Sequence, residues 1–323
     1  MSFRIVWQAP LYLTVGIALL VAVVGCSASA SPAAEADSLP TVSPPTATSE
    51  PIPTSEPTFE PSPTAPAIVG SAEVATASVV GVTISAEPTV PPTPRVVVYA
   101  PILMYHNFDL SKDAYSVRPT QFRAQLRALK AAGFVGVTLT QIADALDQGA
   151  PLPDRPIAIT MDDARATQKT AIEILQEEGF PATMFVPSGW HDLSREFIVS
   201  LDHGTIEIGS HTVWHANLAQ SPQKLYEIRD GKLGLETWLG HDVPGFAYPF
   251  GAYRPADVAE LKRVGVRYAV SIRHGVALRA SERYQWPRML ISNDDPDALV
   301  KRLLGMLHDA EAGKEPPAPA QWG

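Results

Sequence analysis

The chain has 323 residues, a formal net charge of −9 and a single cysteine. One cysteine excludes an internal disulfide framework, and the lack of a basic surplus excludes an electrostatic footprint for nucleic acid. The composition is uneven, because neither Lys nor Arg occurs between Arg4 and Arg95. The sequence therefore divides near residue 95, and only the part that follows has the composition of a globular domain. Nothing in the sequence identifies a protein partner.

The first segment, residues 1–26, has the features of an export signal. Leu11 to Gly25 is an uncharged, mainly apolar run, shorter than the roughly 20 residues that a membrane-spanning helix needs. It ends at Cys26, and Val23-Val24-Gly25-Cys26 resembles the bacterial lipobox, in which the cysteine is lipidated. An uncleaved anchor with an incidental cysteine is the alternative. Both interpretations predict an exported protein tethered to the outer face of the cytoplasmic membrane, in the cell envelope.

Residues 27–94 have the composition of a disordered linker. They hold 14 of the 31 prolines and seven acidic residues without a basic partner. Such a segment buries too little apolar surface to offset its chain entropy, so it predicts an extended stalk. Residues 67–85 are more apolar than the rest, and a strand or two there is an open alternative. We expect the domain at 95–312 and a flexible tail at 313–323.

From residue 95 onward, strand-like and helical patterns alternate. Strands are predicted at 95–106, 134–140, 155–161, 181–186, 205–210, 245–250, 267–272 and 284–291, and helices at 120–134, 140–149, 166–180, 221–240, 255–265 and 295–313. About seven β-then-α units in one domain predict an α/β fold, a distorted (β/α)7-type barrel. A doubly wound open sheet is the alternative, although no glycine-rich phosphate loop follows any strand.

Polar residues collect where the predicted strands end. His106 ends the first strand, Asp162 and Asp163 follow another, and His211 follows the strand at 205–210. The segment Tyr248-Pro249-Phe250 ends the strand at 245–250. Barrel enzymes build active sites at the carboxyl ends of their strands. We therefore expect these residues to share one site.

His211 and His215 are four residues apart, the spacing of one helical turn, so both imidazoles can face one point. Two histidines and one carboxylate can bind a divalent metal and leave positions open for water and substrate. If Asp163 supplies that carboxylate, Asp162 is free to act as a base beside the metal. Surface histidines on a helix, and a strand-end Asp pair that caps a helix, are the alternatives.

These residues resemble the polysaccharide deacetylases, also called the NodB homology domain or carbohydrate esterase family four. The family's TFDDG motif is similar to Thr160-Met161-Asp162-Asp163-Ala164, and its His-Ser/Thr-x-x-x-His motif is similar to 211–215. The resemblance implies that Asp162 is the catalytic base and that Asp163, His211 and His215 bind a divalent metal. Zn²⁺ is the expected ion, with Co²⁺, Ni²⁺ or Mn²⁺ as alternatives.

The third family motif, Arg-x-Pro-Tyr, is matched only in part by 247–250, which lacks the arginine. The poly-N-acetylglucosamine deacetylases share this departure and carry a strand similar to 103–106, Leu-Met-Tyr-His. The resemblance implies that His106 is the general acid, as if the barrel were circularly permuted, and that Arg288 substitutes for the missing arginine. Tyr248, Pro249, Phe250 and Trp286 are the expected substrate or oxyanion contacts.

The sequence therefore predicts a metal-dependent hydrolase that removes N-acetyl groups from a polysaccharide containing N-acetylglucosamine. A tethered carbohydrate-binding protein with weak or no activity is the alternative, because Ala164 replaces glycine and the motif arginine is absent. A stalked structural lipoprotein without a ligand is a third. Which polymer is the substrate does not follow from the sequence.

Overall fold

The computed structural model describes residues 93–202 and 204–314. The predicted signal segment with Cys26, the linker up to residue 92, the apolar stretch 67–85 and the end of the tail lie outside the described residues. Within them, no helix combines the length and the apolar character that crossing a membrane requires.

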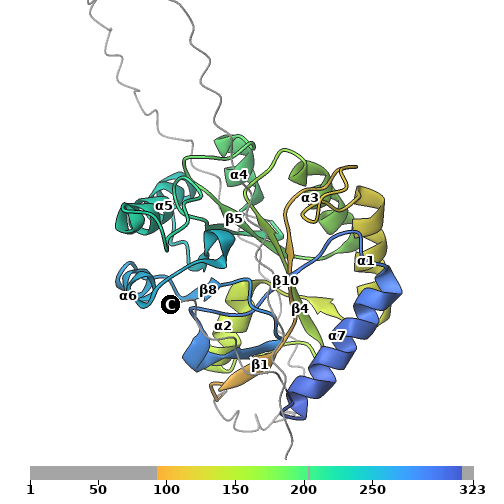
Figure 1. Cartoon of the computed structure of the whole chain (residues 1–323). Helices are drawn as coiled ribbons and strands as arrows, with labels where there is room; N and C mark the ends of the chain where they lie inside the picture. The colour runs from red at the N-terminus through yellow and green to blue at the C-terminus, as the bar shows by residue number, and fades with distance from the viewer. Residues whose placement is uncertain (1–92, 203, 315–323) are drawn as a thin grey trace, which may run out of the picture. The chain divides into compact units, whose positions relative to one another are not determined.

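A curled parallel sheet forms the centre of the domain (Figure 1). Its neighbouring strands follow the order β10-β2-β4-β5-β6-β7-β8, and β3 pairs with β4 outside this path. Their bounds are β2 Ile102–Tyr105, β3 Val135–Gly136, β4 Pro156–Asp162, β5 Ala182–Val186, β6 Ile206–Ser210, β7 Gly245–Ala247, β8 Tyr268–Val270 and β10 Met289–Leu290. Every pairing in this sheet is parallel, as successive β-then-α units require.

The segment around β10 brings the two ends of the sheet together. Met289 and Leu290 pair with β2, while Trp286 forms a parallel bridge to Val270 in β8. The last strand of the chain therefore lies beside the first strand of the sheet. This arrangement confirms the predicted (β/α)7-type fold and excludes the open doubly wound sheet.

The predicted strand at 95–106 is two strands. β1 Val97–Tyr99 pairs antiparallel with β9 Ala277–Arg279, and β2 begins after Pro101. Proline has no N–H to donate to a ladder, so the chain changes partners at this point.

In the part of the chain that the structure describes, seven α-helices surround the sheet (Figure 1). They are α1 Pro119–Ala131, α2 Leu139–Gln148, α3 Gln168–Glu178, α4 Arg195–Leu201, α5 Lys224–Leu239, α6 Pro255–Arg263 and α7 Pro296–Glu311, with short 3-10 turns at η1 Pro249–Gly251 and η2 Ala280–Glu282. Their termini follow local chemistry: α2, for example, begins at a Thr138–Gln141 capping box and ends at the left-handed Gly149. The central strands β4 and β5 are buried along their whole length.

Candidate active site

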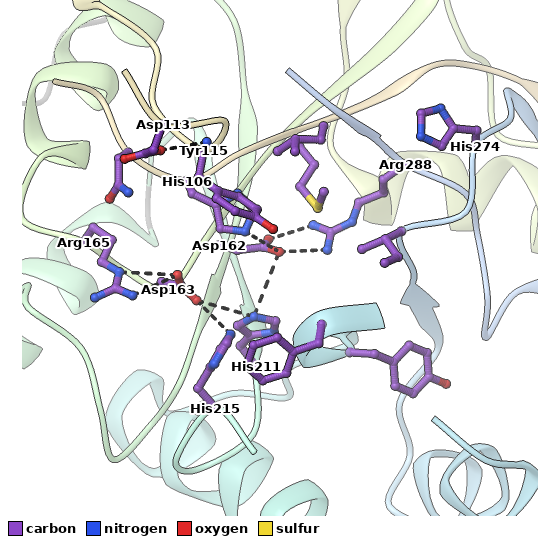
Figure 2. A pocket seen from close by; sticks show the side chains of 16 residues that line it. His106, Asp113, Tyr115, Asp162, Asp163, Arg165, His211, His215, His274 and Arg288 are labelled. Carbon is purple, nitrogen blue, oxygen red and sulfur yellow. Dashed lines mark hydrogen bonds and ion pairs between the residues drawn. The ribbon is translucent and has the colours of Figure 1, made fainter. Parts of the chain in front are cut away.

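A cleft at the carboxyl ends of the strands collects most of the predicted site residues (Figure 2). Its lining comprises Met104, His106, Asn107, Asp113, Tyr115, Asp162, Asp163, Arg165, His211, His215, Tyr248, Phe250, Ile272, His274, Arg288 and Leu290. The strands β2, β4, β6, β7 and β10 each end at or beside one of these residues, which explains how positions far apart in the sequence meet.

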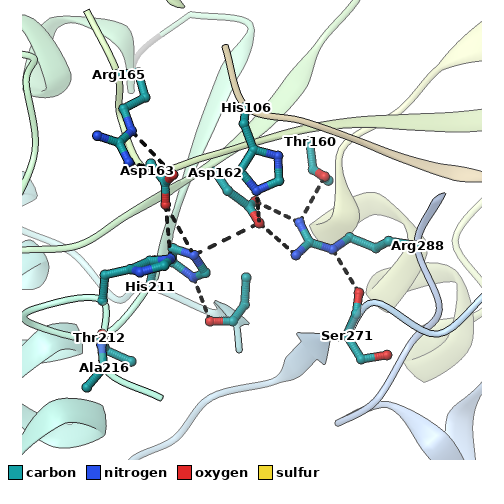
Figure 3. Close-up of polar contacts among 12 residues, drawn as sticks. His106, Thr160, Asp162, Asp163, Arg165, His211, Thr212, Ala216, Ser271 and Arg288 are labelled. Atoms are coloured by element: carbon teal, nitrogen blue, oxygen red, sulfur yellow. Dashed lines mark hydrogen bonds and ion pairs between the residues drawn. The ribbon is translucent and has the colours of Figure 1, made fainter. Parts of the chain in front are cut away.

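Asp162 is the last residue of β4, and Arg288 holds its carboxylate in a bidentate ion pair (Figure 3). The guanidinium nitrogens of Arg288 lie 2.7 and 2.8 Å from Oδ1 and Oδ2 of Asp162. Arg288 is itself buried and donates further bonds to Thr160 Oγ1 and to the carbonyl of Ser271. Burial alone would raise the pKa of Asp162, but Arg288 and the nearby histidines hold it well below its usual range. Asp162 is therefore ionised and fixed in orientation.

Asp163 belongs to the loop after β4, where its φ of 81° turns the chain into the left-handed region. This turn lets two adjacent side chains serve one site. Asp163 Oδ1 lies 3.2 Å from His215 Nε2 and 3.6 Å from His211 Nε2. Among the described residues this buried oxygen has no hydrogen-bond donor.

His211 presents one defined nitrogen to the site. Its Nδ1 lies 2.8 Å from the carbonyl oxygen of Ala247, which can only accept, so Nδ1 carries the proton and Nε2 exposes a lone pair. Burial lowers the pKa of His211 to about 4, and burial also lowers the pKa of His215. Both imidazoles are therefore neutral near pH 7, the form in which histidine binds metals.

The expected helical turn between His211 and His215 is wrong, although the two rings do meet at a centroid distance of 4.8 Å. Thr212 and His215 have φ angles of 70° and 56°, which no α-helix contains. A tight loop brings the rings together instead, and the Glu227 carboxylate of α5 accepts the backbone N–H groups of Val213 and Trp214.

His106 follows β2 and lies on the opposite side of Asp162 from His211 (Figure 3). Its Nε2 is 4.0 Å from Asp162 Oδ2, and its ring packs edge-on against Tyr115. The side chain of Gln168 donates to the backbone carbonyls of both His106 and Asp162, so it ties the two strand ends together.

The remaining predicted contacts divide into two groups. Tyr248 and Phe250 line the cleft, and Phe250 is 61% exposed. Pro249 and Trp286 do not line it. Trp286 is 1% exposed and stacks on Tyr268. It therefore packs in the core and is not placed to contact a substrate, contrary to expectation.

Two departures from the family pattern have a structural explanation. Ala164 adopts a φ of 51°, so the loop keeps the left-handed geometry for which glycine is the usual residue. The family arginine is missing before Pro249, but Arg288, which directly precedes β10, donates two hydrogen bonds to Asp162 instead. The observations that motivated an inactive protein are thus compatible with an intact site.

Sequence reasoning missed Arg165 and Gln168. Arg165 lies 3.3 Å from Asp163 Oδ2, and Gln168 is buried at the start of α3. A buried glutamine in the first turn of a helix has no periodicity that reveals it. The only signal for Arg165 is that it follows Asp163 by two residues.

The residues present fit a divalent metal. Among the described residues, Asp163, His211 and His215 are the group whose ligand atoms lie within 4.8 Å of one another. The unpartnered Asp163 Oδ1 and the free Nε2 of His211 both point to a cation rather than to a hydrogen bond. Two nitrogens and one carboxylate oxygen form a donor set that zinc and similar ions accept.

Comparison with known proteins agrees with this geometry. Residues 149–269 match the family described as polysaccharide deacetylase. This stretch of the domain is similar to the polysaccharide deacetylases. The match spans Asp162, Asp163, His211 and His215, whereas His106 and Arg288 lie outside it.

Similar proteins and solved structures extend the comparison. The chain is 26% identical to the poly-beta-1,6-N-acetyl-D-glucosamine N-deacetylase of Staphylococcus epidermidis over 208 residues, 58% of this chain and 72% of that protein. It is 25% identical to the solved structure of a polysaccharide deacetylase from Bacillus cereus, with a TM-score of 0.57 over 65% of this chain and 69% of that one. The Streptococcus pyogenes deacetylase PplD shares the fold, with a TM-score of 0.59 at 23% identity over 67% of this chain and 99% of that one.

Proposed function

We propose that this protein is a metal-dependent N-deacetylase that acts on an N-acetylglucosamine polysaccharide at the cell envelope. The proposal rests on how five side chains are arranged in the cleft. The cluster of Asp163, His211 and the partly exposed His215 lies beside Asp162, an ionised carboxylate that Arg288 orients in the same cleft.

The metal would be held by Asp163 Oδ1 and the Nε2 atoms of His211 and His215. When bound there, a divalent ion polarises an acetamide carbonyl and lowers the pKa of a water molecule. Zn²⁺ suits these ligands, and Co²⁺, Ni²⁺ or Mn²⁺ would suit them as well.

Asp162 is the proposed general base. It takes a proton from the attacking water while the water oxygen bonds to the carbonyl carbon of the acetamide. The ion pair with Arg288 keeps one orientation of the carboxylate through this transfer, so the proton moves to Oδ2, the oxygen on the side of the histidines. The backbone N–H of Phe250 is the proposed donor to the resulting oxyanion.

His106 is the proposed general acid. It gives a proton to the sugar nitrogen as the C–N bond breaks, because an unprotonated amine is a poor leaving group. The products are acetate and a glucosamine unit. His106 Nε2 lies 4.0 Å from Asp162 Oδ2, so Asp162 can pass the proton taken from water to His106, which restores the ionised Asp162 and the protonated His106.

The proposed substrate is poly-β-1,6-N-acetylglucosamine. It rests on the curated relatives whose names state that substrate, and on the resemblance of Leu103-Met104-Tyr105-His106 to the strand expected in the poly-N-acetylglucosamine deacetylases. An assay of acetate release from this polymer, from chitin oligomers and from peptidoglycan separates the candidates. The proposal requires the highest kcat/KM on the β-1,6 polymer, and a clear preference for either of the other glycans would overturn it.

A further inference from the structure

The two carboxylate oxygens of Asp163 have different partners: Arg165 for one and the two histidines for the other. The Nε and one terminal nitrogen of Arg165 each lie 3.3 Å from Asp163 Oδ2. The other oxygen, Oδ1, faces His211 and His215 at 3.6 and 3.2 Å. Figure 2 shows Arg165 on the side of Asp163 away from both histidines. Only Oδ1 is therefore presented to the metal site.

Trp190 connects Arg165 to the second half of the metal site. The guanidinium carbon of Arg165 lies 4.3 Å from the ring centroid of Trp190, a cation–π stack. The same indole lies 5.6 Å, centroid to centroid, from the imidazole of His215. Trp190 thus contacts both the residue that holds Asp163 and the ring of a second proposed ligand.

The loop that carries Trp190, residues 187–193, is fastened to both ligand-bearing loops. Ser188 and Gly189 donate their N–H groups to the carbonyls of Thr212 and Val213 at 3.1 and 2.8 Å. Asp192 and Leu193 donate to the carbonyl of Ala164 at 3.1 and 3.2 Å.

The contact between this loop and the His211–His215 loop is too close for a side chain. A Cβ on Gly189 would lie 2.9 Å from Val213 Cγ1 and 3.1 Å from the Val213 carbonyl oxygen. The 187–193 loop therefore fixes the spacing between the aspartate loop and the histidine loop, and it holds Trp190 in place.

We propose that Arg165 and Trp190 are positioning residues of the metal site. Arg165 holds Asp163 so that Oδ1 alone meets the ion, and Trp190 fixes the orientation of Arg165 and of the His215 ring. The inference rests on the proposed metal-dependent function and goes beyond its ligands and catalytic groups. Partners behind metal ligands typically change metal affinity by about 10- to 100-fold.

The direction in which metal affinity changes when Arg165 is replaced distinguishes a positioning role from a purely electrostatic one. The positive charge of Arg165 by itself repels a divalent cation, so removal of this charge should tighten metal binding if charge alone matters. If Arg165 instead positions Asp163, replacing Arg165 should weaken metal binding. Lys keeps the charge but lacks the planar pair of donors and the stacking surface, so Arg165→Lys should weaken binding as well.

The test is the Zn²⁺ dissociation constant, measured against a competing chelator, for the unchanged protein and for Arg165→Lys, Arg165→Gln, Trp190→Leu and the double variant Arg165→Lys/Trp190→Leu. We expect each single variant to bind Zn²⁺ at least about tenfold more weakly. The double variant should be weaker by less than the product of the single effects, because the two residues act through one contact.

Arg195→Lys is the matched control. Arg195 stacks over Trp238 at 5.5 Å, an equivalent cation–π pair that does not line the cleft, so its loss should leave Zn²⁺ affinity unchanged. Melting temperatures without metal report any purely structural role. Affinities for Zn²⁺ that stay within threefold of the unchanged protein, or that tighten in Arg165→Gln, would overturn the inference. If the unchanged protein bound no Zn²⁺, Co²⁺, Ni²⁺ or Mn²⁺, the proposed function itself would fail and this inference with it.

Discussion

Asp162 and Asp163 are neighbours in the chain, yet they face different groups. Arg288 holds both oxygens of Asp162, whereas Asp163 directs Oδ1 to two neutral imidazoles and Oδ2 to Arg165. A carboxylate held at both oxygens by a guanidinium is less available as a metal ligand, while its oxygens keep lone pairs that can accept a proton. The surroundings therefore support the proposed roles, Asp162 as the base and Asp163 as the metal ligand, on grounds other than the family resemblance.

His106 gives the first test at the scale of single residues. His106→Gln should fold and bind Zn²⁺ normally but lose kcat on N-acetylglucosamine polymers by about 10²- to 10⁴-fold, because it removes a positioned acid. Activated acetate esters have leaving groups that need no proton, so their hydrolysis should be largely spared. An equal loss on amides and esters would instead make His106 a structural residue.

The buried His211 predicts a pH dependence for the metal-free protein. Its pKa falls from 6.5 to about 4 on folding because burial disfavours the charged ring. Between these values the unfolded chain binds a proton that the folded chain does not, so the free energy of unfolding should decrease as the pH falls through this window. The loss is on the order of 3 kcal/mol at about 1.36 kcal/mol per pKa unit.

Chemical denaturation at pH 7 and pH 4.5 measures this effect, and His211→Gln is the comparison. Other groups that titrate in acid should affect both proteins alike. The unchanged protein should therefore lose more stability than the variant, and equal losses would show that His211 is not held neutral by burial.

At the scale of elements, short loops in unusual backbone conformations hold the site. Every non-glycine residue with positive φ among the described residues belongs to these loops: Asp163, Ala164, Thr212, His215 and Phe250. Such conformations cost about 1–3 kcal/mol each and persist only where surrounding contacts enforce them. Helix α5 supplies one such contact, because Glu227 accepts two N–H groups of the loop between the histidines.

Gly231 of α5 tests this support. A Cβ at position 231 would lie 2.6 Å from the carbonyl carbon of Thr212, so Gly231→Ala must displace the loop between His211 and His215. We expect a loss of about 1–3 kcal/mol in stability from overpacking and weaker Zn²⁺ binding, measured by thermal unfolding and chelator competition.

Gly305 in the middle of α7 is the control, since nothing lies within 4 Å of a Cβ built there. Gly305→Ala should stabilise the protein by about 0.5–1 kcal/mol through helix propensity and leave metal binding unchanged. If Gly231→Ala also left stability and Zn²⁺ binding undiminished, α5 would not support the loop between His211 and His215.

Apolar runs predicted the strands because the central strands are buried along their whole length, and helical periodicity predicted the helices because each buries one face. Polar residues at the strand ends predicted the cleft. The break at Pro101 and the non-helical turn at Thr212 were not predicted, because tertiary contacts there override local spacing. Arg288 was anticipated only through resemblance. The stack of Arg165 on Trp190 joins two loops 25 positions apart, and no local pattern in a single sequence reveals such a contact.

At the scale of the whole molecule, the proposed stalk and anchor would place the active site away from the membrane, where extracellular polymer is accessible. The nearly neutral domain neither attracts nor repels a neutral glycan strongly, so recognition would rest on the cleft.

Cys26→Ser tests the anchor. If Cys26 is lipidated, the variant should still enter the export pathway but lose lipid modification, and it should either be released from the membrane or accumulate unprocessed. Membrane fractionation and mass spectrometry of the N-terminus report both results. An unmodified, membrane-bound product of identical size in both proteins would support an uncleaved anchor.

The central claim is that one cleft removes acetyl groups with a metal held by Asp163, His211 and His215 and a base supplied by Asp162. The most direct measurement is acetate release from poly-β-1,6-N-acetylglucosamine, with metal content determined on the same samples, for the unchanged protein, Asp162→Asn and His211→Ala. We expect activity that chelation abolishes and Zn²⁺ restores. His211→Ala should lose metal and activity together, and Asp162→Asn should keep its metal but lose at least about 10²-fold in kcat. Full activity after complete removal of metal, or Asp162→Asn that retains its activity, would contradict the central claim.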